Sequence, residues 1–229
     1  MKLERHIHCA DCPTKCDIFE ILSANGQSFE ESHTFHARFG KHERICRQSC
    51  DVSHAIYLVE GTAKLYIEGI NDHNIILYLM KPPSYIGLLS FFETPQYSYS
   101  VTALEDSRVC MIDLNFLKSL YRENHQLLLS LNMAFGKSVG LIMKKIITLN
   151  QKNTRGRVAE SLLYLSDFYQ NDHFTIPLTR KELGELSSIS EESTVRLLTE
   201  FKNEQIIELE GREIKIIDKK LLSKISDLG

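Results

Sequence analysis

Short apolar runs follow one another closely in the first half of the chain. Residues 54–66 are rich in β-branched and aromatic side chains and are interrupted at Gly61, and residues 74–80 and 109–112 form two further runs. Gly-containing and Asn-Asp steps between the runs supply turns. Many short strands at such spacing predict a β-sandwich or barrel over residues 38–112.

The apolar period becomes helical after Leu114 and stays helical to about Asn150. Steps of three and four residues form an a/d-like seam that no acidic residue interrupts, as in the helices of coiled-coil dimers. We expect this seam to pack against a second copy of the chain, and the alternative is a helix packed on its own core. The seam consists of Leu128, Leu131, Phe135, Val139, Ile142, Ile146 and Leu149.

A break at residues 151–157 separates this pattern from a helix over residues 158–169. Further on, Thr179 and Glu182 have the spacing of a capping box, which predicts the start of another helix. After a tight break, Ser190 is placed to cap the helix that follows it.

That last helix, residues 191 to about 203, has two different faces. Its predicted outer face carries Glu191, Glu192, Val195, Arg196 and Thr199, and its predicted buried stripe consists of Thr194, Leu197, Leu198 and Phe201. Residues 206–217 alternate about a Glu-Gly step and predict a β-hairpin wing. Two short helices and a wing predict a winged helix-turn-helix, whose second helix enters the DNA major groove, although a plain helical hairpin has a similar pattern.

Charge and composition limit the classes of function that the chain can have. The chain has 229 residues and a net charge of −3, and residues 151–229 carry 12 Lys and Arg against 14 Asp and Glu, so DNA contact must rest on the local placement of basic side chains. No apolar run has membrane-spanning length and the N-terminus has no apolar signal region, so we expect a cytoplasmic protein without a membrane partner. The sequence contains no nucleophile–base pair at an informative spacing and no cofactor-binding fingerprint, so we do not expect an enzyme. A ligand-binding or redox protein that does not act on DNA is the remaining alternative.

Cysteines are the candidate chemical groups. Cys9, Cys12 and Cys16 lie within eight positions near the N-terminus. Reduced cytosolic thiols favour metal or redox chemistry over disulfides. Zinc could take these thiols together with His8 or Cys110, haem could take a cysteine or histidine as axial ligand, and thiols without any metal are a further alternative.

The order of these parts resembles the CRP/FNR family of bacterial transcription regulators over nearly the whole chain. Residues 100–120 (SVTALEDSRVCMIDLNFLKSL) are similar to the end of the family's sensor barrel, and residues 178–201 (LTRKELGELSSISEESTVRLLTEF) to its DNA-reading unit. The resemblance implies an α+β fold. Its parts would be a Cys-rich segment (1–19), a cyclic-nucleotide-binding-type β-barrel of jelly-roll topology (20–113), a dimerisation helix (114–150) and a winged helix-turn-helix (151–229). It also implies a homodimer on an inverted-repeat promoter site, with RNA polymerase as a further partner.

The chain is most similar to the oxygen-sensing FNR branch, which holds a [4Fe–4S] cluster with three N-terminal cysteines and one remote cysteine. Cys9, Cys12 and Cys16 match the first three, and Cys110 matches the fourth by its place in RVCMID, although the gap between Cys12 and Cys16 is shorter than in that branch. A [4Fe–4S] cluster uses four soft ligands, usually thiolates. The resemblance implies that oxygen or nitric oxide acts on the cluster and thereby shifts the dimer helix.

The same resemblance gives no support for cAMP. In the cAMP-responsive branch a Glu holds the ribose and an Arg holds the cyclic phosphate. Here Leu88 stands where the Glu belongs, Tyr97 or Ser98 stands where the Arg belongs, and residues 86–101 contain no basic side chain. The phosphate would lack its charge-assisted partner, so we do not expect cAMP to bind.

The family places one Glu and one Arg of the recognition helix on base pairs, and these correspond to Glu192 and Arg196. Glu accepts from cytosine N4, and Arg donates to guanine O6 and N7. Val195 is placed to touch a thymine methyl group, and the alternative for Arg196 is a surface ion pair with Glu192. The residues expected at phosphates or at the helix start are Thr179, Arg180, Ser190 and Ser193.

Overall fold

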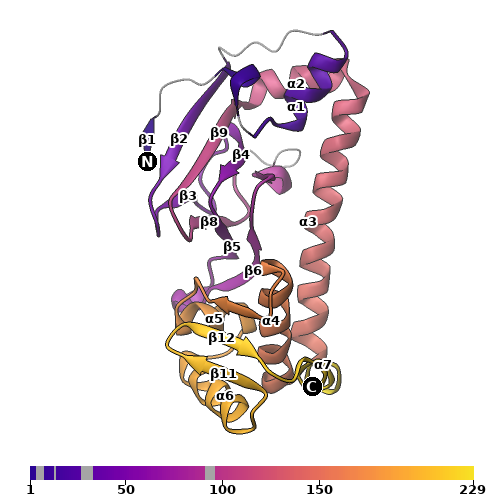
Figure 1. Cartoon of the computed structure of the whole chain (residues 1–229). Helices are drawn as coiled ribbons and strands as arrows, with labels where there is room; N and C mark the ends of the chain where they lie inside the picture. The colour runs from indigo at the N-terminus through magenta and orange to yellow at the C-terminus, as the bar shows by residue number, and fades with distance from the viewer. Residues whose placement is uncertain (4–7, 13, 27–32, 91–95) are drawn as a thin grey trace. The chain divides into compact units, whose positions relative to one another are not determined.

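The computed structural model describes residues 1–3, 8–12, 14–26, 33–90 and 96–229. Pro13 of the Cys-rich segment and residues 91–95 of the stretch compared with the cAMP site lie outside the described residues. The chain forms two compact units (Figure 1). The first unit is Met1–Ile67 with Leu79–Gly140, and the second is Glu68–Tyr78 with Leu141–Gly229.

Antiparallel β-structure makes up most of the first unit and confirms the expected α+β fold with a jelly-roll-type β-domain. Among the described residues, one sheet has the order β1-β2-β9-β4-β7 and the other has the order β3-β8-β5-β6. The strands are β1 (Lys2–Leu3), β2 (Thr34–Phe39), β3 (Arg44–Cys46), β4 (His54–Glu60), β5 (Ala63–Ile67), β6 (Ile75–Met80, whose residues 75–78 belong to the second unit), β7 (Ser84–Ile86), β8 (Ser100–Ala103) and β9 (Ser107–Asp113).

The turn between β4 and β5 depends on Gly61, as the break in the apolar run predicted. Its φ is +85°, and a Cβ there would lie 2.3 Å from the Oγ of Ser107. Any side chain would therefore clash with the start of β9 as well as strain the backbone. On either side of this turn Leu58 and Leu65 are fully buried, as are Val109 and Ile112 of β9.

The helix predicted over residues 114–150 is divided into two helices at Asn124. Helix α2 spans Leu114–Glu123 and α3 spans His125–Gln151. Asn124 has an extended backbone, and its Oδ1 accepts hydrogen bonds from the backbone N–H groups of Gln126 and Leu127, both at 3.1 Å. The side chain thus caps α3 at its start, and the apolar period alone could not reveal this because it runs on through the break.

The predicted seam on α3 is wrong in part. Leu131 is fully buried within its own chain, so it serves the core of the first unit and offers no surface to a second copy. The other predicted seam residues (Leu128, Phe135, Val139, Ile142 and Leu149) are half-buried, and Ile146 is exposed. A different row is exposed: Leu129, Met133, Gly136, Gly140, Met143 and Ile147, again in steps of four and three.

Helix α3 is long and apolar enough, by length and composition alone, to cross a membrane. Core helices of soluble proteins can have the same length and composition. A single such helix is therefore weak evidence for a membrane span.

Helices and a small sheet make up the second unit. Its elements after α3 are α4 (Thr154–Tyr169), β10 (His173–Thr175), α5 (Arg180–Ser187), α6 (Glu191–Asn203), β11 (Ile207–Glu210), β12 (Glu213–Ile216) and α7 (Lys219–Leu228), with the sheet order β10-β12-β11. The predicted hairpin wing is confirmed as β11 and β12. Strand β10, which pairs with β12, and helix α7, which follows β12, were not predicted from the sequence. Leu162, Leu183, Leu198, Phe201 and Ile214 are buried in its core, each stabilising the unit by about 1.5–3 kcal/mol.

Candidate functional site

Helix α5 begins and ends as the sequence predicted. The Oγ1 of Thr179 accepts a hydrogen bond from the Glu182 backbone N–H at 3.1 Å, and a Glu182 carboxylate oxygen accepts one from the Thr179 N–H at 2.7 Å. The helix ends at Ser188, whose φ is +51°. A Cβ on Gly184 would lie 2.7 Å from the Ile189 carbonyl oxygen, so only glycine lets the turn pack this closely on α5.

Helix α6 follows this turn and presents the face that the sequence predicted. Ser190 is its N-cap, with its Oγ accepting from the Ser193 N–H at 3.2 Å. The predicted buried stripe of Thr194, Leu197, Leu198 and Phe201 is buried, and Glu191, Glu192, Val195, Arg196 and Thr199 are exposed. The second helix of this pair therefore offers a polar surface that starts at its N-terminal turn, as a groove-reading helix requires.

Arg196 forms an ion pair with Glu200, whereas the alternative to its base-reading role had named Glu192. Its Nη1 lies 2.9 Å from a carboxylate oxygen of Glu200, and its side chain is 62% exposed. Glu192, also four residues away, is not its partner in this ion pair. An exposed pair at this spacing contributes only about 0.3–0.5 kcal/mol, so the guanidinium can exchange Glu200 for another acceptor at little cost.

Two cations lie together where the wing meets α5. The Arg180 guanidinium donates a hydrogen bond to the carbonyl of Gly211 in the wing turn. Burial and, secondarily, the positive charge of Arg212 lower the pKa of Arg180. Arg212 was missed by the sequence reasoning, although a basic residue beside the Gly of a predicted hairpin turn is the signal that could have found it. The Oγ of Ser193 accepts from the Oγ of Ser190 at 3.0 Å.

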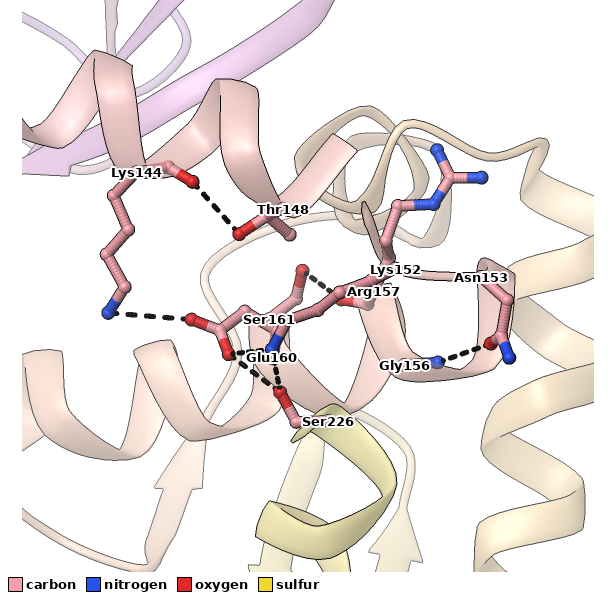
Figure 2. Close-up of polar contacts among 9 residues, drawn as sticks. All are labelled: Lys144, Thr148, Lys152, Asn153, Gly156, Arg157, Glu160, Ser161 and Ser226. Atoms are coloured by element: carbon pink, nitrogen blue, oxygen red, sulfur yellow. Dashed lines mark hydrogen bonds and ion pairs between the residues drawn. The ribbon is translucent and has the colours of Figure 1, made fainter. Parts of the chain in front are cut away.

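Polar contacts fix the corner between α3 and α4 (Figure 2). The Glu160 carboxylate accepts from Lys152 at 3.0 Å and from the Ser226 hydroxyl at 2.7 Å, and Lys144 lies 3.5 Å from it. Burial raises the pKa of Glu160, but the hydrogen bonds from Ser226 and Lys152 outweigh burial, and the pKa is lowered. The Asn153 side chain accepts from the Gly156 N–H at 2.9 Å and starts α4 directly after this corner.

The four predicted metal-ligating cysteines all lie in the first unit and are all buried. Cys9 begins a short 3-10 helix (Cys9–Asp11), Cys12 follows it, and Cys16 is the N-cap of α1 (Asp17–Ala24). Cys110 lies in β9 opposite Tyr57 of β4. Burial first, and then the nearby Cys16, Cys9 and Cys12, raise the pKa of Cys110, so these thiols are close enough to affect one another.

The thiols are neighbours without forming a closed ligand set. Cys12 donates from its Sγ to the Thr14 carbonyl at 3.3 Å. In the part of the chain that the structure describes, no three His, Cys, Asp or Glu side chains stand in position to hold a metal ion. Burial raises the pKa of Cys16 to about 12 even though its sulfur accepts from the Phe19 N–H. Four soft donors gathered in one buried region are nevertheless a donor set of the kind that a [4Fe–4S] cluster uses.

Asp17, directly after Cys16, connects this region to other elements. Tyr85 of β7 and Ser130 of α3 both donate hydrogen bonds from their hydroxyls to its carboxylate. At the other end of α1, the Asn25 amide donates to the Gln126 side chain at 3.1 Å. Helix α1 is therefore joined to α3 at both ends. The sequence reasoning missed this link, although a serine within the apolar pattern of α3 was a signal.

Side chains of the chain itself fill the positions compared with the cAMP site. Leu88 and Tyr97 are both buried. The Tyr97 hydroxyl donates to the His54 carbonyl at 3.5 Å, and the Ser98 N–H donates to the Ser90 hydroxyl at 3.0 Å. Neither position offers a carboxylate or a cation to a nucleotide.

Comparison with known proteins agrees with this arrangement. Residues 36–124 match the family model of the cyclic nucleotide-binding domain, and residues 156–225 match that of the Crp-like helix-turn-helix domain. The chain belongs to the CRP/FNR family. DNA-binding transcription regulation, and not catalysis, is what members of the CRP/FNR family share.

Individual relatives are distant in sequence but match nearly end to end. The chain is 25% identical to the transcriptional activator protein FnrA of Stutzerimonas stutzeri over 95% of its own length and 92% of that protein. It is 26% identical to the transcriptional activator protein Anr of Pseudomonas protegens over 95% and 93%. The structure of FixK2 from Bradyrhizobium japonicum superposes with a TM-score of 0.75 at 18% identity, covering 84% of this chain and 96% of that one. This CRP/FNR fold therefore extends over both units.

Proposed function

We propose that the protein is a homodimeric CRP/FNR regulator that binds inverted-repeat promoter DNA and responds to the state of a [4Fe–4S] cluster. Cys9, Cys12, Cys16 and Cys110 would hold the cluster. The observation that carries this proposal is the burial of these four thiols in one region of the first unit, directly beside a helix joined to α3. We further infer that the protein works in the cytoplasm with RNA polymerase and does not bind cAMP.

The exposed surface of α6 supports sequence-specific DNA reading. Glu192 lies in the first turn of α6, and Val195 and Arg196 follow on the same exposed side. Glu192 would accept from a cytosine, Arg196 would donate to a guanine, and Val195 would touch a thymine methyl group. Ser193 of α6, and Thr179, Arg180 and Arg212 elsewhere in the same unit, would contact phosphates.

Arg196→Ala should cost about 1–3 kcal/mol of discrimination at one guanine in each half-site, because the bidentate donor is lost. Arg212→Ala is the contrasting variant: it should weaken binding about equally on all sequences and lower the salt slope by about one. Competition binding on duplexes substituted at single positions measures both effects. An equal loss on all sequences for Arg196→Ala would refute its role in base reading.

The exposed row on α3 supports the homodimer. Leu129 is 59% and Met133 is 75% exposed, and Met143 and Ile147 continue the same row. Gly136 and Gly140 lie between them, and a Cβ on either would meet no atom within 4 Å. Exposed apolar rows in heptad-like steps are what coiled-coil partners cover, and glycines allow two helix backbones to approach closely.

Met133→Glu should weaken dimerisation at least ~30-fold, about 2 kcal/mol, because two carboxylates would face each other in a row that otherwise excludes water. Asn115→Glu adds the same charge at an exposed position of α2 and serves as the control. Sedimentation equilibrium gives the dissociation constants. An unchanged constant for Met133→Glu would rule out this row as the interface.

Helix α1 offers a route from the cysteines to α3. A bound [4Fe–4S] cluster would supply a group that oxygen or nitric oxide degrades. Cys16 is adjacent to Asp17, so the backbone that orients the Cys16 sulfur also orients the Asp17 carboxylate that accepts from Ser130. Ile18 and Leu22 are fully buried and keep the rest of α1 in place. Moving Cys16 would therefore act mainly on Asp17 and, through it, on α3.

Cluster ligation is tested by anaerobic purification with iron and sulfide analysis. We expect about four iron and four sulfide ions per chain with a visible absorption band, and loss of both in Cys110→Ala. Cys46→Ala, which removes another buried thiol of the same unit, should keep both. A colourless wild-type protein without iron would exclude the cluster, and a protein that contains zinc alone would indicate a structural zinc site. Neither result would contradict the proposal that the protein binds DNA.

The Ser130→Ala variant should still contain iron and sulfide, but its affinity for DNA should no longer depend on whether the cluster is present. We expect at least a ~5-fold difference in affinity between cluster-loaded and cluster-free wild type, and less than about twofold in Ser130→Ala. Ser138→Ala is the matched control, because the Ser138 hydroxyl donates within α3 to the Ala134 carbonyl at 3.1 Å. A variant Ser130→Ala that responds like wild type would show that this link carries no signal.

A further inference from the structure

Two cations from the preceding helices reach the turn of the helix-turn-helix. Lys145 of α3 donates a hydrogen bond from its Nζ to the Leu186 carbonyl. Arg157 of α4 donates from Nη1 to the Ser188 carbonyl at 3.0 Å. Both acceptors belong to the end of α5 and the turn that leads into α6, and all these residues lie in the second unit.

The end of α5 needs such partners. The last carbonyls of a helix have no partner within it, and Ser188 in the left-handed conformation turns the chain away before α6 starts. Cations at a helix C-terminus also interact favourably with its dipole. Lys145 and Arg157 supply both the missing donors and the positive charge.

Placing a lysine here carries a cost. Burial, and then the charge of Arg157, lower the pKa of Lys145 to about 8, while Glu160 opposes them. Neighbouring Lys144, by contrast, is 72% exposed and pairs with Glu160 at 3.5 Å. An apolar residue would avoid this cost at position 145 but could not donate to the Leu186 carbonyl.

We propose that Lys145 and Arg157 are positioning residues that fix the turn, and with it the recognition helix α6, to α3 and α4. The contacts of Glu160 with Lys152 and Ser226 hold the corner between α3 and α4 (Figure 2), so the orientation of α5 and α6 is the remaining freedom. In a dimer built on α3, these two cations then set the separation of the two recognition helices. This inference rests on the proposed dimer.

The spacing of DNA half-sites tests the proposal. The probe is an inverted repeat selected by the wild-type protein from random duplexes, together with versions lengthened or shortened by one base pair and a single half-site. We expect wild type and the control Lys220→Met, at an exposed lysine of α7, to prefer the selected spacing at least ~10-fold, because half-site separation mirrors the geometry of the dimer. Lys145→Met and Arg157→Met should reduce the preference to about threefold or less, with single half-site binding within about twofold of wild type.

Further variants and measurements separate positioning from other roles. Lys145→Arg keeps a donor and should retain the spacing preference. The salt slope of Lys145→Met should equal that of wild type, since Lys145 faces the protein interior; a slope lower by about one would mean a phosphate contact and overturn the proposal. Equal losses on the half-site and on all spacings would indicate a merely structural role and also overturn it.

Failure of the dimer is recognised separately. A wild type that sediments as a monomer and shows no spacing preference would overturn the dimer and this inference together. A dimeric wild type with a clear preference that Lys145→Met and Arg157→Met both retain would overturn the positioning role alone. Thermal unfolding of each variant confirms that the protein compared is folded.

Discussion

Helix α3 has an apolar surface that its own chain covers only in part. This 27-residue helix carries apolar side chains that its own chain leaves exposed, among them Met143 and Ile147. Leu127 and Leu131 are buried within the first unit, whereas Leu129 and Met133 stay in water. Exposing such a row is unfavourable in proportion to its area. In the proposed dimer a second copy of the chain would cover this row with the same surface, and the DNA-binding units would then come in pairs.

Polar side chains on the inward side of α3 show where other elements are attached. Ser130 donates to Asp17 of α1, and Lys145 donates to the Leu186 carbonyl of α5. Ser138 and Thr148 instead donate to carbonyls one turn back in α3 itself. Fifteen residues of continuous helix, about 22 Å, separate Ser130 from Lys145. Helix α3 thus carries one attachment to α1 and another to the end of α5.

Much of the second unit could be predicted from local sequence, because its signals are local. The capping box of Thr179 and Glu182 and the buried stripe of α6 depend on residues three or four positions apart. The partner of Arg196 could not be predicted, since Glu192 and Glu200 are equally spaced from it and only the surrounding surface chooses between them. Arg157 and Lys145 were missed for a related reason: their acceptors are backbone carbonyls, which leave no trace in the residue types.

In the first unit the apolar runs at residues 54–66, 74–80 and 109–112 predicted strands that the structure contains, but the sequence did not show how α3 is covered. An apolar period shows that a helix has an apolar face; it does not show which part of that face its own chain covers. Leu131 and Leu129 lie two positions apart in a run of leucines, and tertiary packing alone makes one buried and the other exposed. Helix α1 was not predicted because it is only eight residues long and its N-cap is Cys16, a residue type that is not a usual helix cap.

The stability of α1 has a consequence for any switch built on the cysteines. Ile18 and Leu22 are fully buried, and Asn25 holds the far end of the helix to Gln126. Burial of two such side chains stabilises α1 by about 1.5–3 kcal/mol each, independently of any metal. Protonated thiols, which the raised pKa values of Cys16 and Cys110 favour, can remain buried at small cost. If a metal group bound by these thiols were lost, α1 would therefore stay folded. The change would be felt in its first turn, where Cys16 is adjacent to Asp17 and the Asp17 carboxylate accepts a hydrogen bond from Ser130 of α3.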